Sequence, residues 1–197
     1  MLTDLKRGAL FTLVTMALLG GGYHALFWAV GRTLFPVQAE GSLIRRADGT
    51  VVGSRLVAQA FGRPEYFHPR PSAVDYNAAS TGGTNFGPSN PDHLAAVRDR
   101  RDAIVKQEGV EAGEIPSEMV TASGGGLDPH IPPAAAALQA PRVAAARGVP
   151  VERVRDLIRA HTEPPGFELL GRARVNVLEL NLALDEAFGR PMTATGR

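Results

Sequence analysis

A long uncharged run near the N-terminus constrains this chain more than any other feature. Between Arg7 and Arg32 the sequence contains no Asp, Glu, Lys or Arg. As a helix rising about 1.5 Å per residue, residues 8–31 would be about 36 Å long, which exceeds the roughly 30 Å hydrocarbon core of a bilayer. A single segment crosses lipid only as a helix, because lipid offers no partner to free backbone N–H and C=O groups. The run therefore predicts one transmembrane helix that tethers the rest of the chain.

A cleaved signal peptide is the alternative interpretation of the same run. Val37-Gln38-Ala39 places small residues where a processing site would need them, directly before Glu40. The apolar part of a signal peptide is usually about 7–15 residues long, however, and this run is longer. We therefore expect a retained anchor, and the short N-terminal flank with Lys6 and Arg7 favours a cytoplasmic N-terminus with the bulk of the chain outside.

Small residues recur along one face of the expected membrane helix. Ala17, Gly21, Ala25 and Ala29 follow one another at intervals of four residues. Such a row lets a second helix approach closely, which predicts a transmembrane partner. The alternative is that alanine and glycine are simply common in membrane helices. His24 is the one ionisable residue within the run, so it is expected to face protein, a water-filled cavity or the lipid headgroups.

The composition limits what the remaining residues can form. The formal net charge is +1 and no cysteine is present, which argues against a nucleic-acid-binding face and excludes disulfides and thiolate sites. Glycine (22) and proline (15) are frequent and aromatic residues make up only 6%, which favours turns over long regular elements. We therefore expect an α+β fold, in which one N-terminal transmembrane helix precedes a single loop-rich exported α+β domain. The expected segments are a tail and transmembrane helix (1–35), a linker (36–40), the exported domain (41–188) and a flexible tail (189–197).

Local patterns place the elements of the exported domain. Asp48-Gly49 lies between two short β-prone stretches, as in a hairpin with a tight turn. Residues 62–91 show no periodicity, but their aromatic residues favour an ordered loop. A short strand or turn is expected at 115–120. Helices are expected at 91–108 after the capping residue Asn90, at 134–147 with a kink or break at Pro141, at 150–160, and at 177–188 after Asn176.

Apolar residues at helical spacing indicate which helix faces are buried. Residues 178–184 alternate between leucine and other residues, which would also suit a strand, but their Glu, Ala and Asp content favours a helix. The expected core positions are Leu94, Val97, Ile104 and Val105 in the helix at 91–108, and Val154, Leu157 and Ile158 in the helix at 150–160.

Two glycine-rich stretches are candidates for phosphate binding through backbone N–H groups. They are Ser123-Gly124-Gly125-Gly126 and residues 81–85. A phosphate-binding P-loop ends in Gly-Lys-Ser/Thr, whereas the two lysines of this chain, Lys6 and Lys106, are not near either stretch. The sequence therefore predicts no nucleotide site of that kind, and a flexible turn is the simpler interpretation of both stretches.

The residues that could bind a metal or catalyse hydrolysis do not form a recognised pattern. The spacing of the histidines and aspartates matches no zinc site, and Asp128 before Pro129 is expected to set a turn while His130 bonds nearby backbone. No nucleophile elbow and no Ser-x-x-Lys pair is present. We therefore predict no catalytic residue and no metal site. The residues considered are His68, Asp92, His93, Asp128 and His130.

Several motifs, in this order, resemble the C subunit of the bacterial Kdp potassium-transporting ATPase. The resemblance covers nearly the whole chain up to Phe188, with threonines in place of the more usual serines around residues 82–83 and Pro132 in place of a common serine. After the N-terminal span, the motifs are GSRLVAQAF (53–61), YFHPRPSA (66–73), TGGTNFGPSN (81–90), SGGGLDPHI (123–131), RVAAAR (142–147) and RVNVLELNLAL (174–184).

The resemblance implies a non-pumping subunit of an ATP-driven, high-affinity potassium uptake complex in the bacterial inner membrane. Its expected partners are a potassium-selecting, channel-like subunit, a P-type ATPase subunit and membrane lipid. ATP and K+ are used by the complex, and no cofactor is expected to bind this chain independently. The family's C subunit is described as a catalytic chaperone that raises the affinity of the ATPase subunit for ATP, and as a clamp on assembly.

A direct contact with ATP conflicts with an exported domain, because ATP is cytoplasmic. We therefore expect an indirect role, in which the chain biases the conformation of its neighbours. Gln59 and the loop Ser123, Gly124, Gly125 and Gly126 are the candidate residues for this effect. The alternative function is an anchored exported ligand-binding module or hydrolase.

Overall fold

The computed structural model describes residues 1–46, 48–166 and 170–191. The backbone divides into two compact units, Met1–Val52 and Gly53–Arg197. Helices and short strands both occur, which confirms the predicted α+β class. The tail expected at 189–197 lies mostly outside the described residues.

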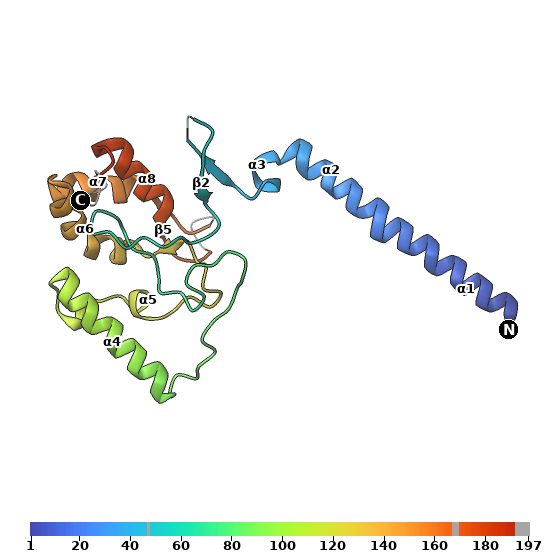
Figure 1. Ribbon diagram of the computed structural model, residues 1–197, viewed down its shortest axis with the longest axis horizontal. Coiled ribbons are helices and arrows are strands. Elements are labelled where there is room, and N and C mark those ends of the chain that lie inside the picture. The colour runs from blue at the N-terminus through green and yellow to red at the C-terminus, as the bar shows by residue number, and fades with distance from the viewer. Residues whose placement is uncertain (47, 167–169, 192–197) are drawn as a thin grey trace, which may run out of the picture. The chain divides into compact units, whose positions relative to one another are not determined.

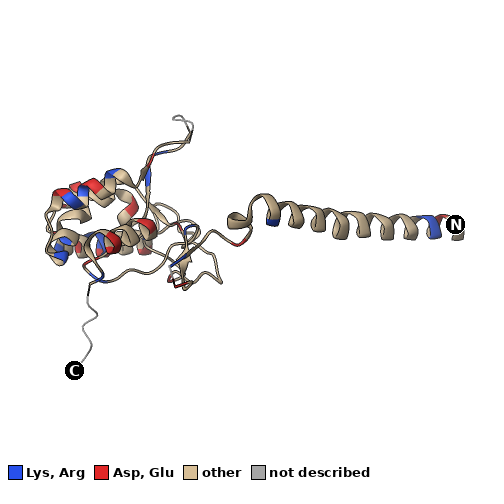
Figure 2. Cartoon of the chain, turned by 90° about the horizontal axis from the view of Figure 1, so that it is seen from above, with Lys and Arg blue, Asp and Glu red and all other residues tan. Residues whose placement is uncertain are grey.

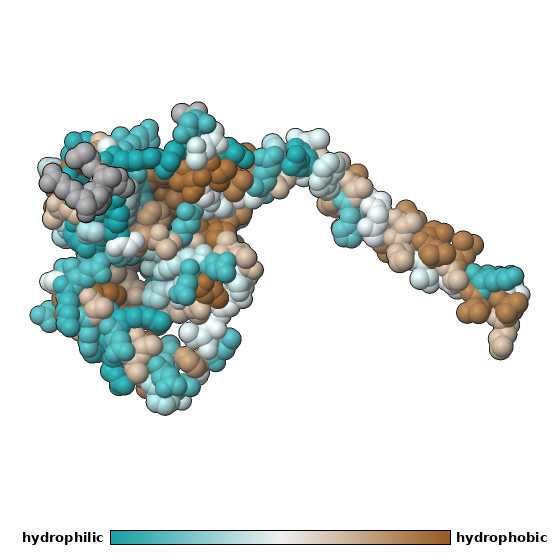
Figure 3. All heavy atoms as spheres, in the orientation of Figure 1, coloured by the Kyte–Doolittle hydropathy of each residue, from teal (hydrophilic) through white to brown (hydrophobic). Residues whose placement is uncertain are grey.

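The first unit begins with one continuous helix, Leu2–Leu34, which is long and apolar enough to cross a membrane (Figure 1). It consists of α1 (Leu2–Thr15), a π-type segment η1 (Met16–Tyr23) and α2 (His24–Leu34). At about 1.5 Å per residue, its 33 residues span about 50 Å. Charged residues colour only its two ends in Figure 2, and apolar residues cover much of its length in Figure 3. The predicted helix is confirmed.

Polar side chains within this helix bond its own backbone. The hydroxyl groups of Thr12, Thr15 and Thr33 donate to helix carbonyls at 2.8–2.9 Å. The His24 ring nitrogen Nδ1 lies 2.8 Å from the Leu19 carbonyl, at the end of the π-type segment. In a lipid environment such internal bonds satisfy the threonine hydroxyl donors and one of the two ring nitrogens of His24.

The π-type segment changes how the small residues of this helix line up. Ala17 and Gly21 lie in its wider turns, whereas Ala25 and Ala29 follow in the α-helical part. An i, i+4 row is straight only where the turn is α-helical, because π-type bonding joins residues five apart. The regular row is therefore interrupted, and packing of these four residues against a partner helix stays a prediction.

A helical turn and a hairpin complete the first unit. The segment expected to be a linker contains α3 (Pro36–Ala39), and β1 (Leu43–Arg45) pairs with β2 (Val51–Ser54). Gly49 has a positive φ of 83°, and the Thr50 N–H donates to Asp48 Oδ1 at 2.8 Å, so the predicted turn is confirmed. The division after Val52 falls within β2, and the domain boundary expected at residue 41 stays a prediction.

The second unit packs three helices and a small sheet around one core. α6 (Pro133–Arg147), α7 (Val151–Ala160) and α8 (Val177–Phe188) lie together in Figure 1. The antiparallel sheet has the order β3 (His130–Ile131), β5 (Arg174–Asn176), β4 (Thr162–Glu163). Its register pairs Ile131 with Val175 and Thr162 with Val175. The core consists mainly of Phe67, Ile131, Ala135, Ala136, Ala140, Val143, Ala144, Val154, Ile158, Val175, Val177, Leu180 and Leu184.

The three core helices begin and end where the sequence predicts. The Asn176 side chain accepts a hydrogen bond from the Glu179 N–H and caps α8, which excludes the strand alternative for this segment. α6 continues through Pro141 without division. Proline has no N–H, so the Ala137 carbonyl lacks its usual helical hydrogen bond. Both residues lie on the exposed side of the helix. In α7, Val154 and Ile158 are buried as predicted and Leu157 is half-buried.

α4 (Pro91–Glu108) forms as predicted, with the Asn90 side chain accepting from Asp92 N–H and Gly109 ending it in the left-handed conformation. Its predicted core stripe is only half-buried: Val97, Ile104 and Val105 are partly covered, whereas Leu94 is 43% exposed and no described residue of α4 is fully buried. The helix lies along the side of the unit rather than inside it. The strand alternative at 115–120 is also wrong, because α5 (Ser117–Val120) forms a helical turn there after Pro116.

Candidate functional site

The segment Arg63–Ser72, which begins with a turn, lies against the core helices and forms one wall of the main candidate site. Residues 55–90, all of which the structure describes, form no helix or strand. This segment, here called the docked segment, carries Phe67, whose side chain is fully buried. The prediction of an ordered loop is consistent with these contacts.

Two buried amide side chains replace the strand that the docked segment lacks. Asn181 on α8 accepts from the Phe67 N–H at 2.8 Å and donates to the Phe67 carbonyl at 3.0 Å. Gln139 on α6 accepts from the His68 N–H at 2.8 Å and donates to the His68 carbonyl at 3.2 Å. Both amides are 1% exposed. Each amide therefore pairs with the N–H and the carbonyl of one residue, as a neighbouring strand would, and the backbone groups of Phe67 that are satisfied in this way are buried.

Two arginines of α6 bind the carbonyl groups of the same segment. Arg142 donates to the carbonyls of Pro64 and Tyr66 at 2.6 and 3.0 Å. Arg147 donates to the Glu65 carbonyl at 2.8 Å and forms a buried ion pair with Asp185 at 2.8 Å. A guanidinium group has five N–H donors, which suits it to several carbonyls at once. These contacts fix the backbone conformation at one side of a cavity.

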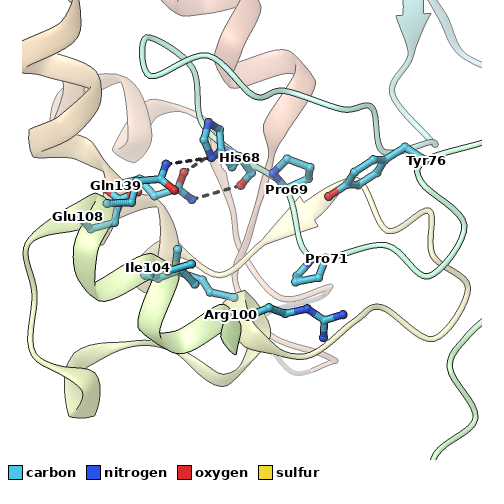
Figure 4. A pocket seen from close by; sticks show the side chains of 11 residues that line it. His68, Pro69, Pro71, Tyr76, Arg100, Ile104, Glu108 and Gln139 are labelled. Atoms are coloured by element: carbon cyan, nitrogen blue, oxygen red, sulfur yellow. Dashed lines mark hydrogen bonds between the residues drawn. The ribbon is translucent and has the colours of Figure 1, made fainter. Parts of the chain in front are cut away.

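The cavity has a volume of about 280 Å³ and lies between the docked segment and α4. Figure 4 shows the lining side chains of the docked segment on one side and those of α4 on the other. Its lining combines apolar and polar groups: His68, Pro69, Pro71, Tyr76, Arg100, Ala103, Ile104, Gln107, Glu108, Met119 and Gln139.

His68 lines this cavity as a neutral imidazole. Its Nε2 lies 3.1 Å from the Arg63 carbonyl, so Nε2 is the donor, and its Nδ1 lies 3.3 Å from Gln107 Nε2. Burial lowers the pKa of His68 below its ordinary value of 6.5, and the charge of Arg142 lowers it further. With both nitrogens engaged, His68 is arranged as a structural group rather than as a general base.

Glu108 carries a buried charge on the α4 side of the cavity. Its side chain is 2% exposed and pairs with Arg142 Nε at 2.8 Å. Its second oxygen, Oε2, is buried and has no hydrogen-bond partner among the described residues. This ion pair connects α4 to α6, in addition to the half-buried apolar residues of α4.

The structure brings Gln59 and the loop Ser123–Gly126 into one region. The Ala58 N–H donates to the Leu127 carbonyl at 3.0 Å, and the Gln59 amide lies against Gly53. The loop is a turn, with Gly126 N–H bonding the Ser123 carbonyl.

This loop is also joined to residues 71–83. The Ser123 N–H donates to the Pro71 carbonyl, and the Gly82 N–H donates to the Gly125 carbonyl, at 3.0 and 3.1 Å. A Cβ atom on Gly83 would lie 2.6 Å from the Gly124 carbonyl, which explains why glycine occupies that position. The expected flexible turn is therefore a hydrogen-bonded junction between two glycine-rich stretches.

The residues considered for a metal do not converge. In the part of the chain that the structure describes, no three His, Asp or Glu side chains could share an ion. Asp128 sets a turn as predicted, since its Oδ1 accepts from the His130 N–H at 3.0 Å. Burial raises the pKa of Asp128, but hydrogen bonds from His130 and Arg70 outweigh it, and the net pKa lies below the ordinary value of 3.8.

Sequence reasoning missed the four polar residues that hold the docked segment. They are Gln139, Arg142, Arg147 and Asn181, and all lie on helices whose other inward positions are apolar. A polar side chain on the buried stripe of an amphipathic helix was the available signal, because such a group requires a hydrogen-bond partner.

The comparisons with known proteins cover nearly the whole chain. The family model described as K+-transporting ATPase, c chain, matches residues 5–186. A protein named potassium-transporting ATPase KdpC subunit, from Xanthomonas campestris pv. campestris (strain B100), is 49% identical over 189 residues, 95% of this chain and 88% of its own length. Proteins of the same name are 46% identical in Geobacter metallireducens, over 93% of this chain and 98% of theirs, and 48% identical in Polaromonas naphthalenivorans, over 98% and 99%.

Proposed function

This chain belongs to the KdpC family of K+-transporting ATPase c chains, and on this premise we propose that it is the accessory subunit of a bacterial potassium-uptake ATPase. Its role is to stabilise the assembly of the complex and to raise the ATP affinity of the P-type ATPase subunit. Its partners are that subunit and a potassium-selecting, channel-like subunit. The chain itself transfers no phosphate and binds no nucleotide.

One observation carries the proposal. The family match extends from residue 5 to residue 186, so it includes both the apolar helix and the second unit. The similarity to proteins named as subunits of a potassium-transporting ATPase therefore extends over both parts of the chain and supports the proposal.

Co-purification tests the assembly role. The affinity-tagged chain is expressed in its own bacterium, extracted in mild detergent and isolated. We expect a P-type ATPase subunit and a channel-like subunit to be recovered with it, and a strain lacking the chain to regain growth at limiting potassium when it is restored. Recovery of the chain alone would favour an anchored ligand-binding module or hydrolase instead.

The proposed location is the inner membrane, with the N-terminus in the cytoplasm and residues 41–188 outside. The cysteine-free sequence suits a labelling test, because each introduced cysteine is the only one. A membrane-impermeant maleimide should label Ala187→Cys in intact cells and Thr3→Cys only after permeabilisation. The reverse pattern contradicts the orientation, and a mature chain that begins at Glu40 contradicts the retained anchor.

The proposed effect on ATP is indirect. An exported domain cannot touch cytoplasmic ATP, so it alters ATP affinity only by favouring one conformation of its neighbours. Coupling of this kind is typically about 5- to 150-fold in affinity. The complex lacking this chain should therefore need a correspondingly higher ATP concentration for half-maximal ATPase activity, and equal ATP dependence with and without the chain would contradict the role.

Two substitutions address the candidate contacts. Gly21→Leu places a large side chain in the row of small residues, and we expect it to reduce recovery of the membrane partners. Gln59→Ala should change the ATP dependence of the complex without changing its assembly, if the region around the Ser123–Gly126 loop transmits the effect.

A further inference from the structure

The cavity between the docked segment and α4 contains one charge that the fold does not compensate. Two of its lining residues are charged, Arg100 and Glu108, whereas His68 is neutral. Glu108 is paired with Arg142 at 2.8 Å and is 2% exposed, so its charge is balanced within the protein. Arg100 forms no ion pair with any described residue and bonds only a backbone carbonyl. The cavity therefore has an excess of one positive charge.

Arg100 presents the edge of its guanidinium group that normally binds a carboxylate. Its Nη1 donates to the Val120 carbonyl at 3.1 Å, which fixes the side chain between α4 and α5. Its Nε and Nη2 bond no described residue, and neither is a buried atom, so a ligand can reach both. These two nitrogens form an edge that donates two parallel N–H bonds to one carboxylate. Arg100 can therefore bind an anion without giving up a contact within the protein.

The remainder of the cavity suits a small apolar group. Its volume of about 280 Å³ is at the lower end of the range of ligand pockets, which is about 300–1,000 Å³. Apolar side chains come from both walls and from α5: Pro69, Pro71, Ala103, Ile104 and Met119. The size and the lining together favour a small organic molecule whose charged group is attached to apolar atoms.

Tyr76 is held at this cavity in a costly backbone conformation. Asp75 and Tyr76 have positive φ values of 51° and 57°, which residues with large side chains rarely adopt. The Tyr76 hydroxyl donates to the Arg70 carbonyl at 2.8 Å, and its N–H donates to Ser72 Oγ at 3.0 Å. Burial raises the pKa of the Tyr76 phenol above its ordinary value of 10.0, and the nearby charge of Arg100 acts against this increase. Strained residues held by such contacts are frequent at ligand sites.

We propose that this cavity binds a small organic monocarboxylate, with the carboxylate on Arg100 and the apolar part between Ile104 and the prolines of the docked segment (Figure 4). One negative charge matches the excess charge of the cavity, whereas a dianion such as phosphate would place a second charge near Glu108. The ligand contacts both walls and so stabilises α4 against the docked segment. The inference does not depend on the proposed function, because it concerns this chain alone.

Calorimetric titration of the full chain in detergent tests the proposal. Benzoate is the probe, benzamide is its uncharged counterpart of the same shape, and detergent without protein gives the background heat. We expect one benzoate per chain with a Kd of about 1 mM or lower, and an affinity for benzamide that is at least about tenfold weaker. Sodium chloride and sodium phosphate at equal ionic strength should not displace benzoate.

Two variants locate the bound probe. Arg100→Gln should weaken benzoate binding at least about tenfold, whereas the same change at Arg98, on the exposed face of α4, should alter it less than about twofold. Arg100→Gln also loses the bond to the Val120 carbonyl, so Ala103→Phe provides a second test. Ala103 is an exposed residue of the lining, and phenylalanine there fills the cavity while Arg100 is retained. Ala103→Phe should abolish binding without lowering Tm.

Three results would overturn the proposal. If benzoate does not bind at about 10 mM, the cavity is not a carboxylate site. If benzamide binds as tightly as benzoate, the apolar lining and not the Arg100 charge selects the ligand. If the Arg100→Gln or Ala103→Phe chain is folded and binds benzoate as tightly as the unsubstituted chain, benzoate binds outside this cavity.

Discussion

Replacing Asn181 by leucine tests whether buried amides hold the docked segment. Leucine has a similar size and is compatible with the apolar surroundings of α8, so the substitution removes hydrogen bonding with little change of volume. The Phe67 N–H and carbonyl then lose partners at 2.8 and 3.0 Å. Among the described residues, these two backbone groups have no other hydrogen-bond partner.

The expected loss follows from the number of groups left unpaired. A buried polar group without a partner costs about 1–3 kcal/mol, so two groups lower the free energy of unfolding by about 2–6 kcal/mol. For a domain of this size, each kcal/mol corresponds to about 2–4 °C in Tm, which gives a decrease of at least about 4 °C. Water cannot compensate readily, because Phe67 is fully buried.

Two measurements check this expectation on the full chain in detergent. Thermal unfolding followed by far-ultraviolet circular dichroism reports the change in Tm, and hydrogen exchange with mass spectrometry reports protection of residues 63–72. Asn181→Leu should lower both, whereas Glu186→Gln on the exposed side of the same helix should stay within about 0.5 kcal/mol of the unsubstituted chain. An unchanged or higher Tm with unchanged protection at residue 67 would refute the amide mechanism.

Three further predictions concern the same unit. Arg142→Met leaves the Glu108 carboxylate, which is 2% exposed, without its ion pair, and should cost about 3–5 kcal/mol in urea unfolding. The double substitution with Glu108→Leu should recover only the part of the loss that is due to the unpaired carboxylate, because the hydrogen bonds from Arg142 to the Pro64 and Tyr66 carbonyls stay absent. The pKa of His68 is lowered in the folded state, so below pH 6.5 the unfolded chain binds more protons than the folded chain. The free energy of unfolding should therefore decrease as the pH decreases below 6.5, by up to about 1.4 kcal/mol per pH unit. His68→Gln should reduce that slope when Tm is measured over an acid titration. Gly126→Ala should cost about 1–3 kcal/mol, since Gly126 has φ of 72° and a Cβ there would lie 2.6 Å from Val74 Cγ2, whereas Gly125→Ala, with open space at its Cβ, should leave Tm nearly unchanged.

Local sequence determined the elements whose causes are local. The uncharged run predicts the membrane helix because its length and composition are themselves the physical requirement, and Asn90 and Asn176 mark helix starts because a cap acts within three residues. The turn at Asp48-Gly49 is predictable for the same reason. The family resemblance, which depends on ordered motifs, likewise needs no coordinates.

Only the tertiary structure decided which segments of distant sequence meet. Asn181 and Phe67 are 114 residues apart, and Gln139 and His68 are 71 apart, so no periodicity relates them. The apolar residues of α4 suggest a core stripe, but the structure buries them only in part and joins α4 to α6 through the Glu108 and Arg142 ion pair, which no local pattern indicates. Sequence patterns report what each element could bury, but the match between one element's unpaired polar groups and another's is set only when the chain is folded.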